Sequence, residues 1–443
     1  MRTRLVLSLA LAAGSLTACD SILDQSPVDE LPDDRAITSA EGARAALAGA
    51  YNALQSTAYY GGDFLIFNDL VADNAVNIGT FTTYAGADAN QLRADNATVY
   101  DIWTAIYDAI NRDNNIIEKV PALTDLQDAE KNQILGEAHA LRALHYHDLV
   151  KLYADVPLRL TPVTGVDEAA EIARSPEAEV YAQIRADLAA AEGLITETEP
   201  ATRVTAGAVD ALQARVALYE GDYATAAAEA DEVLAQGYTL AAAYSELFDE
   251  EGQDTPEDIL KVVFTAQQYT NIGFYYISAE LGGSGEVSPS QSLIDAYDPA
   301  DARLAWSISG TEEGSASGVK FPTTFGAEDF HVIRLAEVLL IKAEALARQD
   351  DLVGAVDAYN LVRERAGLAG HTLGVDVTTR EDVLAAIDLE RRLELAFEGD
   401  RWPDLVRTGR AAEVMDIPEF QTLFPIPQTE IDVAPGLTQN PGY

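Results

Sequence analysis

The sequence predicts a protein dominated by α-helices, with tetratricopeptide-like helical hairpins, an irregular, loop-rich ligand-facing portion and minor β structure. Apolar residues recur at helical spacing from Thr38 onward, which indicates amphipathic helices. The helical pattern is interrupted twice. A first irregular segment (residues 59–98) is rich in Gly, Asn, Asp and aromatic residues, and a second (residues 262–330) is rich in aromatic residues, Gly and Ser. Long irregular segments in a compact protein usually carry function or are disordered.

Residues 1–18 have the pattern of a secretory signal peptide. Arg2 and Arg4 precede an apolar run, which is shorter than the ~20 residues that a bilayer-spanning helix needs. The run ends in Leu-Thr-Ala-Cys, the form of a bacterial lipobox, and Cys19 is the only cysteine of the chain. We therefore expect Cys19 to be lipidated, residues 19–37 to form a tether, and the N-terminal lipid to be the only membrane attachment.

Two helical hairpins are marked by their turns. The first has apolar stripes in 209–219 and 223–233 around Gly221-Asp222, and the second has them in 335–346 and 352–359 around 349–351. Small residues in the first hairpin allow close helix packing. Both hairpins resemble tetratricopeptide units, whose period is about 34 residues. Because no run of adjacent repeats is visible, two ordinary helical hairpins remain an alternative.

The chain is strongly acidic, with 73 Asp and Glu against 29 Lys and Arg and a formal net charge of −44. This charge excludes nucleic acid and anionic lipid surfaces as partners, since both bind through Lys and Arg.

Two clusters suggest chemistry, and both have a structural explanation. His139, His145 and His147 cannot converge on one ion from a single helix, at ~100° per residue, so we predict no metal site. Glu390, Glu394 and Glu398 share a helix face, as paired glycosidase carboxylates could. Arginines lie among them at 391, 392 and 401, which favours salt bridges. We predict no catalytic residue and no cofactor.

The irregular segments are the candidate ligand site, because aromatic rings beside amides and carboxylates suit carbohydrate binding. Packing in a local core is the alternative for each single ring. The candidates comprise four rings, which we expect to be exposed, and four polar side chains: Tyr84, Tyr275, Tyr276 and Trp306, with Asn77, Asp88, Asn90 and Asn271.

Four stretches resemble motifs of the SusD/RagB family, in the family's order and behind a lipobox. They are 141–158 (LRALHYHDLVKLYADVPL), 333–345 (IRLAEVLLIKAEA), 390–405 (ERRLELAFEGDRWPDL), and the C-terminal LFPIPQTEI (423–431) with NPGY (440–443). Ala154 stands where the family usually has glycine, and Pro403 where an aromatic residue is common.

The resemblance implies a SusD-like N-terminal helical region (38–260) and a C-terminal region (261–443) that includes the second irregular segment. It also implies a lipoprotein exposed at the outer-membrane surface, which captures glycans or peptides and passes them to a SusC-like TonB-dependent barrel. Because the matched motifs belong to the scaffold, they assign no ligand residue. A secreted glycan-degrading lipoprotein and a purely structural envelope adaptor are the alternatives.

Overall fold

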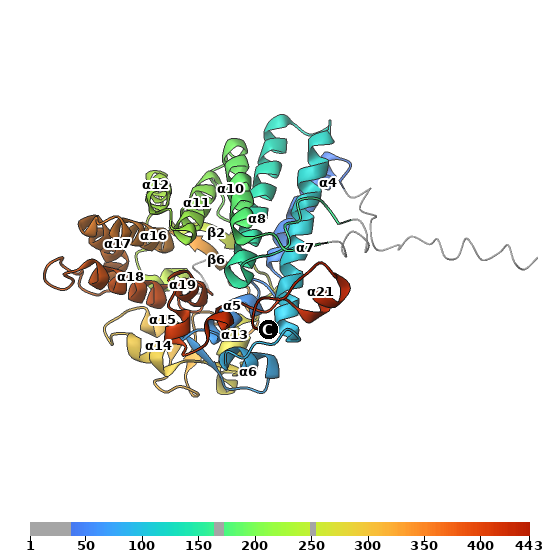
Figure 1. The fold of residues 1–443 in the computed structure, drawn as a ribbon. Helices are drawn as coiled ribbons and strands as arrows, with labels where there is room; N and C mark the ends of the chain where they lie inside the picture. The colour runs from blue at the N-terminus through green and yellow to red at the C-terminus, as the bar shows by residue number, and fades with distance from the viewer. Residues whose placement is uncertain (1–36, 164–171, 249–253) are drawn as a thin grey trace, which may run out of the picture.

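The computed structural model describes residues 37–163, 172–248 and 254–443. The signal peptide, Cys19 and all of the tether except residue 37 lie outside the described residues. Most of the described chain is helical, which confirms the predicted fold class (Figure 1). The long helices are α4 (Ala40–Leu54), α7 (Ala97–Lys119), α8 (Asp128–Tyr153), α10 (Glu177–Leu194), α11 (Ala206–Glu220), α12 (Tyr223–Ala235), α16 (Leu335–Arg348), α17 (Leu352–Arg365) and α18 (Arg380–Glu394).

The two predicted hairpins are confirmed. α11 ends at Glu220 and is followed by Gly221, whose left-handed backbone (φ 75°) is the common glycine conformation after a helix. Asp222 then caps α12 by accepting a hydrogen bond from the Thr225 backbone amide. α16 and α17 form the second hairpin, in which Asp351 caps α17 by accepting a hydrogen bond from the Gly354 backbone amide. α12 packs against α16, so the hairpins are neighbours in space although the second irregular segment separates them in sequence.

Short elements make up the rest of the described chain. The helices and 3-10 turns are α5 (Asp63–Leu70), α6 (Thr82–Asp88), η1 (Val120–Ala122), η2 (Tyr244–Leu247), α13 (Ile272–Tyr276), η3 (Ala279–Leu281), α14 (Gln291–Ala296), α15 (Leu304–Ser307), α19 (Arg401–Arg407), α20 (Ala411–Val414), η4 (Glu419–Thr422) and α21 (Gln428–Val433). The strands are β1 (Ala75–Asn77), β2 (Asp258–Val262), β3 (Val287–Pro289), β4 (Ile308–Ser309), β5 (Ser317–Gly318) and β6 (Phe330–Arg334). They pair antiparallel as β1·β3, β2·β6 and β4·β5, which confirms minor β structure.

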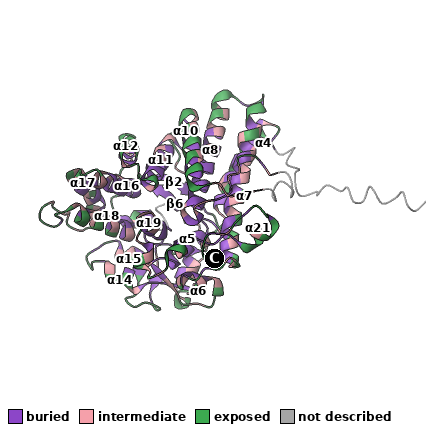
Figure 2. Ribbon diagram, in the orientation of Figure 1, coloured by how far each residue is buried: buried purple, intermediate pink, exposed green. Residues whose placement is uncertain are grey.

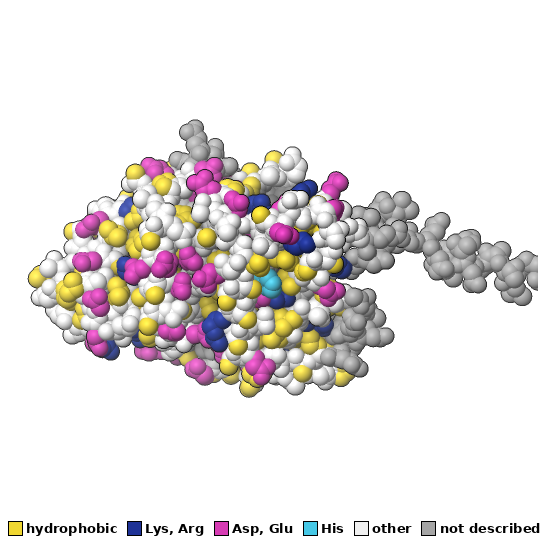
Figure 3. Space-filling model, turned by 90° about the horizontal axis from the view of Figure 1, so that it is seen from above, with side chains coloured by type: hydrophobic (Ala, Val, Ile, Leu, Met, Phe, Trp, Pro, Cys, Tyr) yellow, Lys and Arg dark blue, Asp and Glu magenta, His cyan; other side chains and the backbone are white. Residues whose placement is uncertain are grey.

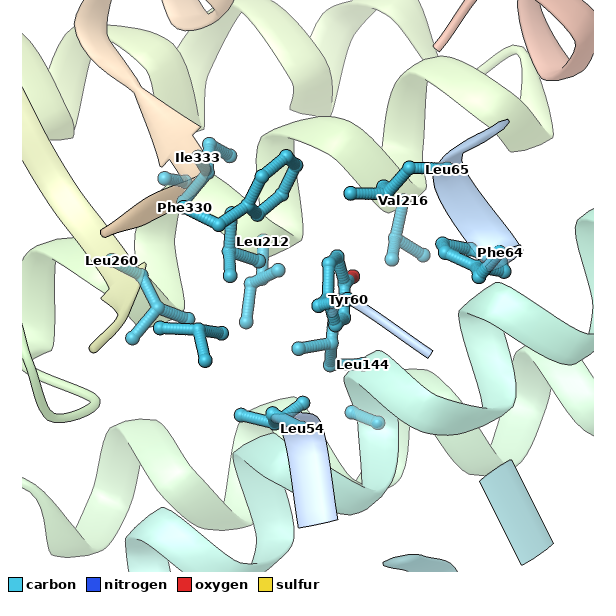
Figure 4. Packing of buried hydrophobic residues seen from close by; sticks show 14 of the residues in the cluster. Leu54, Tyr60, Phe64, Leu65, Leu144, Leu212, Val216, Leu260, Phe330 and Ile333 are labelled. Carbon is cyan, nitrogen blue, oxygen red and sulfur yellow. The ribbon is translucent and has the colours of Figure 1, made fainter. Parts of the chain in front are cut away.

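One hydrophobic core joins the helices to both irregular segments. Tyr60 and Phe64 of the first irregular segment and Phe330 of β6 meet Leu144 of α8 and Leu212 of α11 (Figure 4). Buried residues follow the inward faces of the helices and fill the region between them (Figure 2). The irregular segments are therefore fixed to the same core as the hairpins. The boundary predicted at residues 260 and 261 falls within β2 and remains a prediction.

Ala154, which stands where the family usually has glycine, has an unusual backbone conformation. α8 ends at Tyr153, and Ala154 has φ 58°. Glycine adopts positive φ at the lowest cost, which explains why a glycine is common here in the family.

Carboxylates are spread over the face of the molecule that is seen from above (Figure 3). The acidic excess therefore forms a solvated surface there. None of the helices in the described ranges has the length and hydropathy needed to cross a bilayer.

We expect Trp402→Ala to lower the free energy of unfolding by about 3–5 kcal/mol, because a fully buried ring leaves a cavity when it is removed. Trp402 lies on α19 with 0% of its surface exposed. Thermal denaturation measures the loss. Leu361→Ala is the control, since Leu361 lies on α17 and is 49% exposed. Equal melting temperatures for Trp402→Ala and the wild type would contradict the packing role.

Candidate ligand-binding site

Tyr84 lies on α6 and is buried, with 2% of its surface exposed. Its hydroxyl donates to the Asp63 carboxylate at 2.6 Å, and its ring contacts Phe67 and Tyr275 edge to face. Burial raises the pKa of Asp63 to about 6. The expectation of an exposed ring at position 84 is therefore wrong, because α6 turns this side chain toward α5 and α13.

Tyr276 is also buried, with 3% of its surface exposed. Its hydroxyl donates to Asp69 at 2.9 Å, and its ring lies 4.8 Å from that of Phe397. Burial raises the pKa of Asp69 to about 7. The expectation of an exposed ring is wrong here too. Trp306 is half-buried against a small cluster that includes Tyr244 and Phe248, so a ligand role for Trp306 remains a prediction.

Tyr275 belongs to a continuous line of aromatic rings at the surface. Successive ring centroids along this line lie 5.2, 4.7, 5.4 and 6.0 Å apart. We call it the aromatic ridge, and its members in spatial order are Tyr269, Phe325, Phe274, Tyr275 and Phe81. Phe325 is 54% exposed, and Tyr269 and Phe81 are each 41% exposed. Phe274 and Tyr275 are half-buried and connect the exposed rings.

Backbone pairing fixes one end of the ridge. Thr270 and Gly326 form an antiparallel bridge, with N···O distances of 3.0 and 3.3 Å. Tyr269 and Phe325 flank this bridge on the two strands, and their ring centroids lie 5.2 Å apart. The Asn271 amide also donates to the carbonyl of Gly61 at 2.8 Å, which ties the second irregular segment to the first.

Glu286 fixes the other end of the ridge. Its carbonyl accepts the backbone amides of Ile78 and Gly79 at 2.9 and 3.0 Å. Its carboxylate accepts the Thr80 amide at 2.7 Å, next to Phe81. Gly79 permits this approach, because a Cβ at that position would lie 1.7 Å from Glu286 Oε2. Glu286 therefore positions the turn that carries Phe81.

The four polar candidates lie in different surroundings. Asn77 ends β1, and Asp88, half-buried at the end of α6, accepts a hydrogen bond from the Asn77 backbone. Asn90 is buried with φ 50°. Asn271 precedes α13, and its carbonyl accepts the amide of Tyr275. Asn77 and Asn271 each have a buried side-chain oxygen to which no described residue donates. A ligand role for these four residues remains a prediction.

Sequence reasoning missed four members of the ridge: Tyr269, Phe274, Phe325 and Phe81. All of them lie in the two irregular segments that were predicted to carry the site. Their exposure depends on pairings between distant residues, such as Thr270 with Gly326, and no local pattern indicates those pairings.

The three histidines of α8 have different neighbours. His139 Nδ1 lies 2.7 Å from Asp187, and His145 Nδ1 lies 2.9 Å from the Tyr59 hydroxyl. The ring of His147 packs edge to face on Tyr219. These neighbours come from α10, the first irregular segment and α11.

The carboxylates at 390, 394 and 398 form a buried ion network. Arg334 bonds Glu394 at 2.5 Å and Glu398 at 2.7 Å. Glu394 also pairs with Arg365, and with Arg303 at 3.2 Å. The predicted structural role is confirmed for these carboxylates, but the predicted partners are wrong. Their cations come from β6, α17 and the second irregular segment, whereas the neighbouring arginines reach other carboxylates: Arg391 pairs with Asp404, and both Arg392 and Arg401 pair with Asp73.

The structure thus defines a helical scaffold that presents an aromatic surface on irregular segments. A SusD family model matches residues 320–418, and a model described as starch-binding associating with outer membrane matches residues 22–218. The two models match different parts of the chain, and together with the fold they identify a SusD-like protein.

Relatives and solved structures agree with this assignment over nearly the whole chain. SusD-like protein P38 of Formosa agariphila is 27% identical over 505 aligned positions, which cover 98% of both chains. A SusD superfamily protein from Bacteroides vulgatus has the same fold, with a TM-score of 0.83, 22% identity, and coverage of 91% of this chain and 99% of its own. A laminarin binding SusD-like protein has a TM-score of 0.79 at 25% identity, with 92% of this chain and 100% of its own covered.

We expect Glu394→Gln to destabilise the fold by about 3–5 kcal/mol, because buried arginines would lose their counter-charge. Burial alone would raise the pKa of Glu394, but Arg365, Arg334 and Arg303 hold it well below its usual range. A carboxylate with a lowered folded-state pKa stabilises the fold above its unfolded pKa, and this contribution is lost as the pH falls. The wild type should therefore lose stability below about pH 4.5 more steeply than Glu394→Gln.

Urea titrations between pH 3 and pH 7 measure this difference. Glu381→Gln is the matched control, because Glu381 lies in the first turn of the same helix and is exposed. Parallel pH profiles for the wild type and Glu394→Gln would contradict the role of the ion network.

Proposed function

We propose that this protein is a cell-surface lipoprotein that captures glycans on the aromatic ridge and passes them to a SusC-like TonB-dependent transporter. The observation that carries the proposal is the ridge itself, in which three exposed rings are held in line by two half-buried ones. Exposed ring faces stack on the C–H faces of sugars, while nearby amides and carboxylates bind hydroxyl groups. A row of rings suits a chain of sugar units.

The family and its members support the glycan as ligand. One matching family model is described as starch-binding, and similar solved proteins are described as laminarin binding and as a surface glycan-binding protein from Bacteroides fluxus. We propose that the protein binds and releases the glycan without cleaving it. The carboxylates at 390, 394 and 398, which could have served a glycosidase, are instead paired in the buried ion network.

The lipobox supports the anchor, and the family resemblance supports the transporter partner. In this proposal Cys19 carries the lipid, and residues 20–37 connect it to α4. The tether lets the helical body remain next to a barrel in the same outer membrane, which the family description also names.

We expect a Tyr269→Ala and Phe325→Ala double variant to bind glycan tens of fold more weakly. Each stacked ring contributes on the order of 1 kcal/mol, and 1.4 kcal/mol corresponds to a factor of ten. Affinity electrophoresis in laminarin and starch finds the ligand, and calorimetry measures the affinity.

Leu361→Ala is the matched control for this experiment. It removes a side chain that is 49% exposed from α17, which lies away from α13 in Figure 1. Unchanged affinity in a folded double variant would remove the ridge from the site.

We expect Cys19→Ala to move the protein out of the membrane fraction, because the acyl chains supply the membrane attachment. After gentle detergent extraction, the wild type should co-purify with an outer-membrane barrel at near-equal stoichiometry, and the variant should not. Ser15→Ala, just before the lipobox, is the control and should behave as the wild type. A variant that stays in the membrane in normal amounts would contradict the anchor. A wild type that is recovered without a barrel would contradict the partner.

A further inference from the structure

Acidic residues lie on the loops that are joined to the aromatic ridge at its two ends and in its middle. At one end Glu328 folds back on Gly326, next to Phe325. In the middle, the loop that carries exposed Glu280 is tied to the ridge, because the Ser284 amide donates to the Phe274 carbonyl at 2.7 Å.

Two further acidic loops meet at the Phe81 end. Glu286 accepts the amide next to Phe81. The loop with exposed Glu312 and Glu313 reaches Ile78 through Gly314, whose Cβ position lies 4.0 Å from the Ile78 side chain. The loops next to both ends of the ridge and next to its middle thus carry acidic residues.

The cations of the two irregular segments are already paired with carboxylates. Arg303 is bound by Asp301 at 2.7 Å, and Lys320 by Glu398 at 2.8 Å, and both are buried. Arg93 is exposed, and it forms a two-bond pair with Asp95 at 2.8 Å. These three are the only Lys and Arg residues of residues 59–98 and 262–330.

The acidic residues next to the ridge should therefore affect charged and uncharged glycans differently. Sulfate and uronate groups are bound mainly by Arg and Lys, and they are repelled by carboxylates in a partly desolvated site. Uncharged sugars offer hydroxyl donors, which carboxylates accept, and C–H faces, which rings cover. We propose that the ridge selects uncharged glycans over glycans that carry uronate or sulfate groups. This inference rests on the proposed glycan-capturing function.

The test measures affinity for laminarin and soluble starch, which are neutral, and for alginate, which is a polyuronate, at low and high salt. We expect a neutral glycan to bind at least about tenfold more tightly than alginate at low salt. The affinity for laminarin and soluble starch should not change with salt, because salt screens only interactions between charged groups.

A charge-reversal variant provides the second arm. Glu280→Lys with Glu312→Lys should raise alginate affinity by about tenfold at low salt and leave neutral binding within about twofold. Glu381→Lys with Glu413→Lys is the control, because it makes the same charge change at exposed positions of α18 and α20.

The outcomes separate this inference from the function on which it rests. If alginate binds as tightly as the neutral glycans, and the Tyr269→Ala and Phe325→Ala double variant no longer binds it, the charge selection is overturned and glycan capture on the ridge is retained. Binding of no polysaccharide in the panel would contradict glycan capture, and the selection with it. An unchanged alginate affinity in the charge-reversal variant would also overturn the selection.

Discussion

The buried contact of Arg334 with Glu394 and Glu398 is the constraint on which the C-terminal half of the structure depends. Arg334 is 1% exposed and lies where β6 passes into α16, while Glu394 is the last residue of α18 and Glu398 lies in the turn that follows. A buried charge that loses its partner costs several kcal/mol. Two family motifs that are distant in sequence, one with Arg334 and one with the glutamates, are therefore held together. This contact gives the two motifs a shared structural role.

The same network supports the ligand-facing portion. Lys320 and Arg303 belong to the second irregular segment, and both reach carboxylates of the motif at 390–405. Lys320 also lies over the rings of Tyr244 and Phe248. A segment with few regular elements is thus fixed at two buried points. Rings that must meet a flat sugar face benefit from such support, because a rigid site loses less entropy when it binds.

Local sequence patterns predicted the helical scaffold, whereas the exposure of the candidate site residues depends on tertiary contacts. The Gly221-Asp222 turn is correct because a helix end and the following cap depend on neighbouring residues alone. The expected exposure of Tyr84 is wrong because Tyr84 and Phe81 lie in one short stretch, and only the packing of α6 shows which ring is covered. The arginine partners of Glu394 were missed for the same reason, since they come from β6, α17 and residue 303.

The bridge between Thr270 and Gly326 and the bond from Asn271 to Gly61 join stretches that are far apart in the chain. A ligand bound along the ridge from Tyr269 to Phe81 contacts these stretches together and links them for as long as it is bound. Its binding free energy adds to the stability of the fold, by about 2.7 kcal/mol when its concentration is a hundred times Kd. Local opening of the irregular segments should then become rarer, and their backbone amides should exchange with solvent more slowly. Slower amide exchange in the backbone beneath the ridge would thus indicate that a ligand occupies this surface.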